Sequence, residues 1–153
     1  MLSSLRKQLD ELAPLSAELN SASDAFMEAL KAVEAELATL NLGLEVEYNR
    51  PIVEGDLKEE QDEQGVVTQK FKRLVFLGYG TNTGSGWGLQ ARHYRMVFRP
   101  DDQMEYIQER VRTLLNSPRA IRMAAAEHLS GLLQAIRDEA SKRLDALKRV
   151  TDQ

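Results

Sequence analysis

Residues 2–40 read LSSLRKQLDELAPLSAELNSASDAFMEALKAVEAELATL. Apolar residues recur here at alternating intervals of three and four positions, and only Ser16 and Ser23 interrupt the series. Its members are Leu2, Leu5, Leu9, Leu12, Leu19, Phe26, Leu30, Val33, Leu37 and Leu40. A mean spacing of about 3.5 residues is typical of a coiled-coil contact line, because each apolar side chain then faces a partner helix. The pattern predicts a helix that packs lengthwise against another helix.

Pro14 lies inside this series. Proline costs about 3 kcal/mol in a helix interior but little in the first turn of a helix. We therefore predict a helical arm over residues 1–13 and a long helix over residues 15–41, with one kinked helix as the alternative. Gly43 follows the last apolar position and suits a left-handed helix end.

The middle of the chain, residues 44–99, carries strand patterns. Apolar and polar residues alternate from 44 to 49, and β-branched and aromatic residues concentrate in 66–77 and 87–98. We predict a three-stranded antiparallel β-meander from these segments. In the third strand the apolar positions change parity, which predicts a β-bulge near Arg92 and His93.

Two connections join the predicted strands. Residues 54–65 carry six acidic residues and one lysine, which predicts a solvated acidic loop. Residues 78–88 hold five glycines, which predicts a glycine-rich hairpin tip. A phosphate-binding loop is not indicated, because no lysine follows the glycines and the next element is a strand.

The last third of the chain, residues 102–151, predicts two helices. Asp102 can cap a helix over residues 102–115, and Ser117 with Pro118 can start another over 118–150. The chain is thus predicted to be a single α+β domain, residues 1–153. The helices would pack on each other, on one face of the sheet, or both.

The composition excludes several classes of chemistry. The chain is 42% hydrophobic and 29% charged, has a net charge of −4, and contains no cysteine. Disulfides, thiolate zinc sites and thiol catalysis are therefore excluded. No signal peptide pattern and no apolar run of membrane-spanning length is present, so we predict a cytoplasmic protein without a membrane partner.

Charge is distributed unevenly along the chain. Residues 66–99 carry six basic groups and no acidic one, whereas residues 43–65 carry eight acidic and two basic groups. We predict first that these charges pair across the sheet. An anionic ligand or acidic protein partner for the basic hairpin comes second, and nucleic acid comes last, since no RNA-binding signature is present.

Candidate binding residues follow from these patterns. The basic hairpin offers cations and aromatic stacking surfaces for a ligand or partner. The residues concerned are Lys70, Lys72, Arg73, Tyr79, Trp87, Arg92, His93 and Arg95. The helical series offers an oligomer interface, for which the candidates are Leu19, Phe26, Leu30, Val33 and Leu37.

No catalytic or metal-binding constellation is visible in the sequence. Gly84-Ser85-Gly86 is only a fragment of a nucleophile elbow. The two histidines, His93 and His128, are not spaced as a ligand pair. We predict no catalytic residue, no metal site and no cofactor.

The sequence therefore predicts a non-enzymatic protein–protein interaction or assembly module. It would self-associate through its long helices as a homodimer or higher homo-oligomer. It would present the basic, glycine-rich hairpin to a protein partner. The alternative is a module that binds an anion, another ligand or nucleic acid with the same hairpin.

Overall fold

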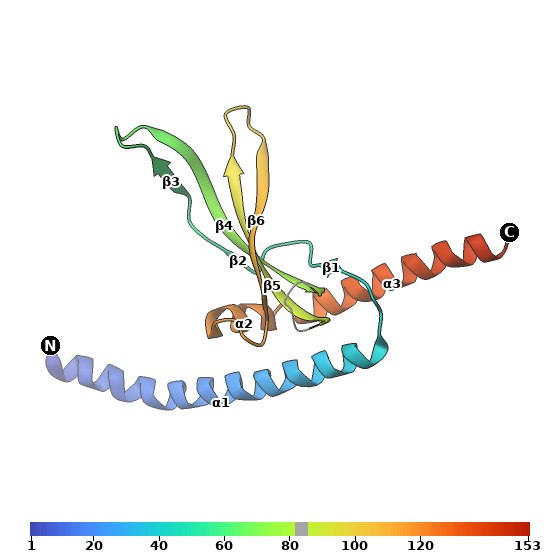
Figure 1. The fold of residues 1–153 in the computed structure, drawn as a ribbon. Coiled ribbons are helices and arrows are strands. Elements are labelled where there is room, and N and C mark those ends of the chain that lie inside the picture. The colour runs from blue at the N-terminus through green and yellow to red at the C-terminus, as the bar shows by residue number, and fades with distance from the viewer. Residues whose placement is uncertain (82–85) are drawn as a thin grey trace.

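The computed structural model describes residues 1–81 and 86–153 (Figure 1). The elements are α1 (Leu2–Leu40), β1 (Val46–Glu47), β2 (Val53–Glu54), β3 (Lys58–Gln61), β4 (Val67–Gly80), β5 (Gly88–Phe98), β6 (Met104–Thr113), α2 (Arg119–Ala126) and α3 (Leu129–Thr151). Asn82, Thr83, Gly84 and Ser85 of the predicted hairpin tip lie outside the described residues, and so does most of the Gly84-Ser85-Gly86 fragment. In the described part of the chain, no helix combines the length and apolarity needed to cross a membrane.

The sheet is antiparallel and has six strands, so the predicted three-stranded meander undercounts it. The order is β1-β4-β5-β6, and β2 and β3 also pair with β4. Three short strands thus follow one another along the same edge of the 14-residue β4. Part of the predicted acidic loop forms this edge, because the extended segment 58–61 pairs with the β4 backbone.

The helix predicted over residues 102–115 is wrong, since this segment forms β6. Asp102, expected to cap a helix, has a φ of 60° and lies in the turn between β5 and β6. The backbone N–H of Arg99 donates to the carbonyl of Gln103 across this turn at 2.9 Å. Charged residues spaced like helical pairs, Glu105, Glu109 and Arg112, suggested a helix, but backbone pairing with β5 decides the conformation.

The predicted break of the first helix near Pro14 is also wrong. α1 runs without interruption from Leu2 to Leu40 and contains Pro14, which corresponds to the single-helix alternative. On the 3-4 grid Pro14 falls on the face opposite the apolar series, so its ring faces water and the helix bends (Figure 1). The helix ends at Asn41, whose φ of 48° is left-handed.

The helix predicted over 118–150 is divided into α2 and α3 at Glu127 and His128. The interruption places the ring of His128 against that of Tyr48, with the ring centroids 5.5 Å apart. Gly131, in the first turn of α3, also lies against Tyr48. A Cβ atom at Gly131 would approach Cε2 of the Tyr48 ring to 2.6 Å, so this close packing requires glycine.

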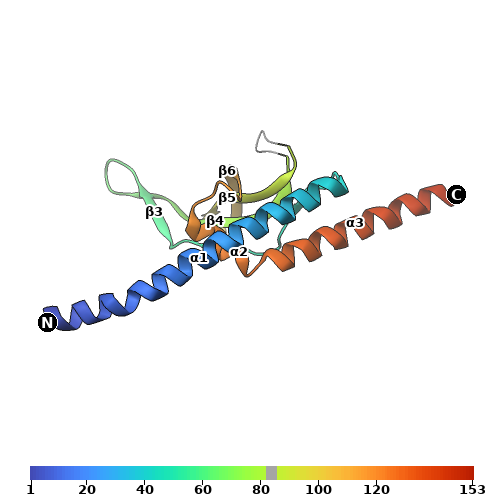
Figure 2. The same cartoon turned by 90° about the horizontal axis from the view of Figure 1, so that it is seen from below.

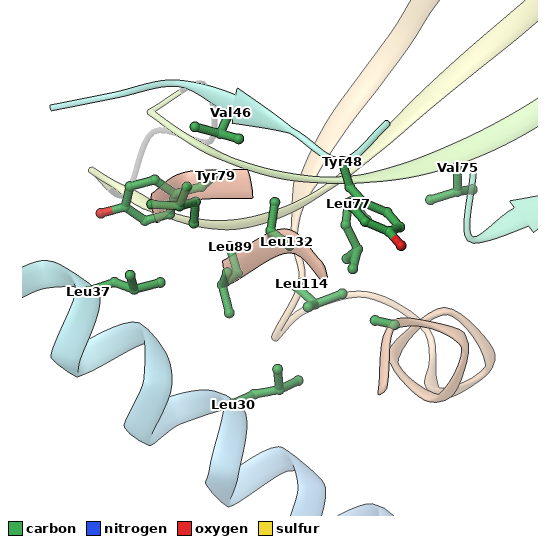
Figure 3. Packing of buried hydrophobic residues seen from close by; sticks show 13 residues of the cluster. Leu30, Leu37, Val46, Tyr48, Val75, Leu77, Tyr79, Leu89, Leu114 and Leu132 are labelled. Carbon is green, nitrogen blue, oxygen red and sulfur yellow. The ribbon is translucent and has the colours of Figure 1, made fainter. Parts of the chain in front are cut away.

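The helices cover one face of the sheet rather than pairing with each other along their length. α1 contacts β5 and α2, while α3 contacts β1 and β4. The core lies between these helices and the near half of the sheet (Figure 3). Its labelled members in Figure 3 are Leu30, Leu37, Val46, Tyr48, Val75, Leu77, Tyr79, Leu89, Leu114 and Leu132.

Both long helices extend beyond this core. The N-terminal half of α1 and the C-terminal half of α3 project in opposite directions (Figure 2). The far half of the sheet, in which β3, β4, β5 and β6 pair in this order, rises away from the helices (Figure 1). The molecule therefore has a small packed center with several elements extending from it.

Candidate functional site

Each of the six basic residues of the predicted hairpin lies close to a carboxylate. The pairs are Lys70–Glu59 at 3.5 Å, Lys72–Glu54 at 3.6 Å, Arg73–Glu109 at 3.3 Å, Arg92–Glu47 at 3.2 Å, Arg95–Glu60 at 3.1 Å, and Arg99–Glu105. Charge compensation across the sheet is therefore confirmed. Sequence reasoning missed the two acidic partners on β6, because it placed that segment in a helix.

The candidate binding residues do not form one surface, because strand alternation divides them between the two faces of the sheet. The helix-facing side carries Tyr79 and Arg73 of β4, and His93 and Arg95 of β5. The opposite face carries Lys70, Lys72 and Arg92. Trp87 precedes β5, and its ring lies 5.7 Å from that of the buried Tyr79.

Arg73 and Arg95 are direct cross-strand neighbours on the helix-facing side. Both guanidinium groups lie over the ring of Phe71, with Cζ 5.3 and 4.5 Å from the ring centroid. Both also approach Glu109, Arg73 at 3.3 Å and Arg95 at 3.7 Å. Glu109 is the extra residue of the bulge, since His93 pairs with Arg110 and the next register pair uses Gln108.

The predicted bulge therefore lies close to its expected place, between His93 and Tyr94, but the extra residue belongs to β6. β5 stays in regular register with β4. The change in apolar parity along β5 has another cause: Leu89 and Ala91 face the helices, whereas Tyr94 and Met96 face the other side.

His93 lines a cleft of about 520 Å³ at the edge of the helix layer. Burial lowers the pKa of this histidine below its usual value of 6.5, and the charges of Arg110 and Arg112 lower it further. Arg73, Arg110 and Glu109 line the same cleft. In the described residues 1–81 and 86–153, no three potential metal ligands come together.

Arg92 forms the center of a polar network on the open face of the sheet. Its side chain is only 11% exposed, and its Nε donates to Oε1 of Gln90 at 2.9 Å. Its Nη1 and the hydroxyl of Tyr94 both donate to Oε2 of Glu47, at 3.2 and 2.6 Å. Burial and this bond to Glu47 raise the pKa of Tyr94 to about 12. Gly78 leaves room for the guanidinium.

The candidate interface residues divide between the core and the surface. Leu30 and Leu37 are buried, and Phe26 and Val33 pack partly buried against the same core. Leu19 is 47% exposed. The C-terminal half of the 3-4 series is therefore used inside the chain, and only its N-terminal half remains open.

Exposed leucines line the N-terminal half of α1, where every residue from 1 to 22 is exposed. Their exposed fractions run from 47% at Leu19 to 84% at Leu2. We call this surface the N-terminal seam, and its members are Leu2, Leu5, Leu9, Leu12, Leu15 and Leu19. Of these six residues only Leu19 was among the candidate interface residues, although all of them except Leu15 belong to the 3-4 series.

A smaller apolar surface lies near the end of α3. Leu144, Leu147 and Val150 are exposed there by 50%, 66% and 73%. This surface spans residues 144–150, against residues 2–19 for the N-terminal seam. The end of α3 projects in the direction opposite to the N-terminal end of α1 (Figure 2). Tyr106, on the outer strand β6, is 52% exposed beside a hollow of about 280 Å³ on the open face of the sheet.

The fold and these surfaces define an α+β protein with a long helix that extends beyond its own core. Comparison of the chain with protein-family models, with curated proteins and with solved structures found no match. Function is therefore inferred from the geometry and chemistry of the surfaces themselves.

Proposed function

We propose that this protein is a non-enzymatic assembly module whose copies join through the N-terminal seam of α1. The observation that carries the proposal is the row of six leucines on a helix segment in which every residue from 1 to 22 is exposed. Contiguous exposed apolar surface of this kind marks interaction sites in proteins.

The stability of the segment itself supports a partner. Helices in proteins gain most of their stability from packing an apolar face, and isolated helices of about 15 residues are marginal in water. We call the sheet, α2, α3 and the part of α1 that packs on them the body of the molecule. Residues 2–19 form a helix of that size whose residues are all exposed outside the body. A second helix along the seam supplies the missing burial.

The expected strength of this contact follows from the area available. Fully burying a leucine side chain is worth about 1.5–3 kcal/mol at about 25 cal/mol per Å², which corresponds to roughly 60–120 Å². With about 60% of each leucine exposed, two seams bury on the order of 600 Å² of leucine surface. The gross gain of about 15 kcal/mol compares with an association cost of about 4–15 kcal/mol. We therefore expect a concentration-dependent complex in the micromolar range rather than a permanent one.

The paired charges on the hairpin bear on what the assembly presents. Each candidate cation of the hairpin has a carboxylate within 3.6 Å, which reduces its attraction for an anion or nucleic acid. The projecting far half of the sheet remains as the surface that the module presents to a protein partner. Tyr106 and Met104 on β6 and Val66 between β3 and β4, each more than half exposed, are apolar residues available there.

Sedimentation equilibrium of matched variants tests the proposal. We expect the wild-type protein to shift from monomer to dimer over the micromolar range, and Leu9→Asp to remain monomeric, with no more helix by circular dichroism than the wild-type protein has when diluted to its monomer. Leu147→Asp is the control, because it places the same charge on the other exposed helix end. A wild-type protein that stays monomeric at several hundred micromolar contradicts the proposal.

A further inference from the structure

We infer that the occupant of the N-terminal seam is the same segment of a second copy, running antiparallel, with the overlap limited to residues 2–19. The inference rests on the proposed self-association and adds the direction and register of the contact. Both follow from where the body of the molecule stands relative to the seam.

The seam faces approximately the same side of α1 as the body. The 3-4 series continues from the seam into Leu30 and Leu37, which are buried against the body. The series drifts around a straight helix by about 20° per heptad, so Leu9 lies within roughly 60° of the face that carries Leu30. Figure 1 shows the sheet and α2 standing on this one side of α1.

The body also closes the seam at a defined residue. Nη1 of Arg119, in the first turn of α2, donates a hydrogen bond to Oδ1 of Asn20 at 2.5 Å. A helix lying along the seam therefore reaches α2 just past Leu19 and stops there. The free seam is limited to about 18 residues, or about 27 Å of helix.

The position of α2 at Asn20 excludes a second copy whose α1 runs parallel to the first. A parallel second copy would carry its own body at the same end of the seam and on the line already occupied by the first body. An antiparallel copy carries its body beyond the N-terminus of the first α1, where the described chain places nothing (Figure 2). The two bodies then cap opposite ends of the helix pair.

The antiparallel arrangement also matches the leucines with one another. With the overlap centered between residues 10 and 11, Leu9 lies opposite the partner's Leu12, and Leu2 opposite the partner's Leu19. Leu5 lies opposite the partner's Ser16, the single polar residue of the line. If the register shifts by one heptad toward greater overlap, Leu2 lies beyond the partner's Asn20 and collides with its body. If the register shifts by one heptad toward smaller overlap, the ends of both seams remain exposed.

A second copy fits this seam better than the exposed end of α3 does. An antiparallel contact between identical segments is closed by a twofold axis and uses both seams completely. The end of α3 carries three exposed apolar residues and points away from the seam (Figure 2). A contact between seam and α3 would join copies head to tail into open chains, which sedimentation separates from a dimer.

Disulfide trapping tests direction and register directly, because the chain has no cysteine. Ser16→Cys and Leu5→Cys are prepared separately, one of them carrying a size tag, and equilibrated together in a glutathione redox buffer. A disulfide requires Cα atoms about 4.4–6.8 Å apart, which the proposed register provides between the two variants. Identical positions lie about 16 Å apart along the helix axis, so neither variant links to itself.

We expect the mixed dimer band on a non-reducing gel to exceed either homodimer band by at least about tenfold. Leu2→Cys mixed with Leu19→Cys is the second pair and gives the same result. A dominant Ser16→Cys homodimer indicates a parallel contact and overturns the inference. Sedimenting dimers that give no mixed disulfide with either pair also overturn it, while self-association itself stands. Absence of any dimer contradicts the proposed function as well.

Discussion

The carboxylate of Glu34 accepts a hydrogen bond from the backbone N–H of Leu89 at 2.8 Å. This contact joins the C-terminal part of α1 to the start of β5 and satisfies a backbone donor there. Leu89 itself is fully buried. The helix is therefore held to the sheet by a polar contact as well as by its apolar face.

Removal of this acceptor should destabilise the protein. We expect Glu34→Ala to lower the free energy of unfolding by about 1–3 kcal/mol, because the Leu89 N–H loses its partner in a part-buried site. Glu34→Gln keeps an oxygen acceptor and should cost less. Glu28→Ala, which removes only an exposed pair with Lys31, is the control and should cost about 0.5 kcal/mol or less. Urea unfolding measures all three, and equal losses for Glu34→Ala and Glu28→Ala would contradict this role.

The two halves of α1 should respond differently to the same substitution. Leu30 is fully buried in the core, so Leu30→Asp buries an unpaired carboxylate and should prevent folding. Leu9→Asp lies on the exposed half and should leave the monomer folded. Circular dichroism at low protein concentration compares the two variants. A wild-type melting curve for Leu30→Asp would contradict the assignment of Leu30 to the core.

The effect of an alanine at Gly131 should depend on Tyr48. Glycine to alanine within a helix normally stabilises a protein by about 0.5–1 kcal/mol. Here the new Cβ would meet the Tyr48 ring at 2.6 Å, so we expect Gly131→Ala to lower the melting temperature. In a Tyr48→Ala background the same change should raise it. Thermal unfolding of the four proteins of this cycle tests the expected change of sign.

The Arg92–Glu47 pair should be worth more than an exposed ion pair. Arg92 is 11% exposed and its hydrogen bonds are shared with Gln90 and the Tyr79 carbonyl. A double-mutant cycle of Arg92→Ala and Glu47→Ala should give a coupling of about 1.5–3 kcal/mol. The exposed Lys31–Glu28 pair should give about 0.2–0.5 kcal/mol in the same measurement. Equal coupling energies for the two pairs would show that the network around Arg92 does not strengthen its interaction with Glu47.

Stability should fall as the pH drops below about 6.5, in part through His93. Burial and the charges of Arg110 and Arg112 lower the pKa of His93 in the folded protein below 6.5. The unfolded chain therefore binds more protons near and below this pH, and the free energy of unfolding rises with pH. Most carboxylates titrate at lower pH, so urea midpoints at pH 7.5 and 5.5 isolate the histidines. His93→Gln should reduce the difference between the two midpoints, and an unchanged difference would contradict this role of His93.

Sequence patterns predicted the parts of the fold that depend on short-range periodicity. The 3-4 series indicated a long N-terminal helix, and the concentration of β-branched and aromatic residues indicated β4 and β5. These sequence patterns failed where one local pattern is compatible with both a helix and a strand. Residues 104–113 carry both charged spacings typical of a helix and residues suited to a strand, and the neighbouring β5 decides between them.

The candidate site was also predicted only in part from the sequence. The uneven charges along the chain correctly predicted that cations and carboxylates pair across the sheet. They did not show which carboxylate each cation meets, nor that acidic partners come from β6. These relationships depend on register, and a register joins residues that are far apart in the sequence.

By itself, the sequence determined that the first forty residues are helical and carry one apolar line, because helical periodicity is a property of neighbouring residues along the chain. It did not determine that a single helix runs through Pro14. Only the tertiary structure decided that Leu30 and Leu37 lie in the core while Leu9 and Leu12 remain exposed. The physical reason is that burial depends on which surfaces meet. The sheet and α2 reach α1 as far as Asn20 and cover no residue before it.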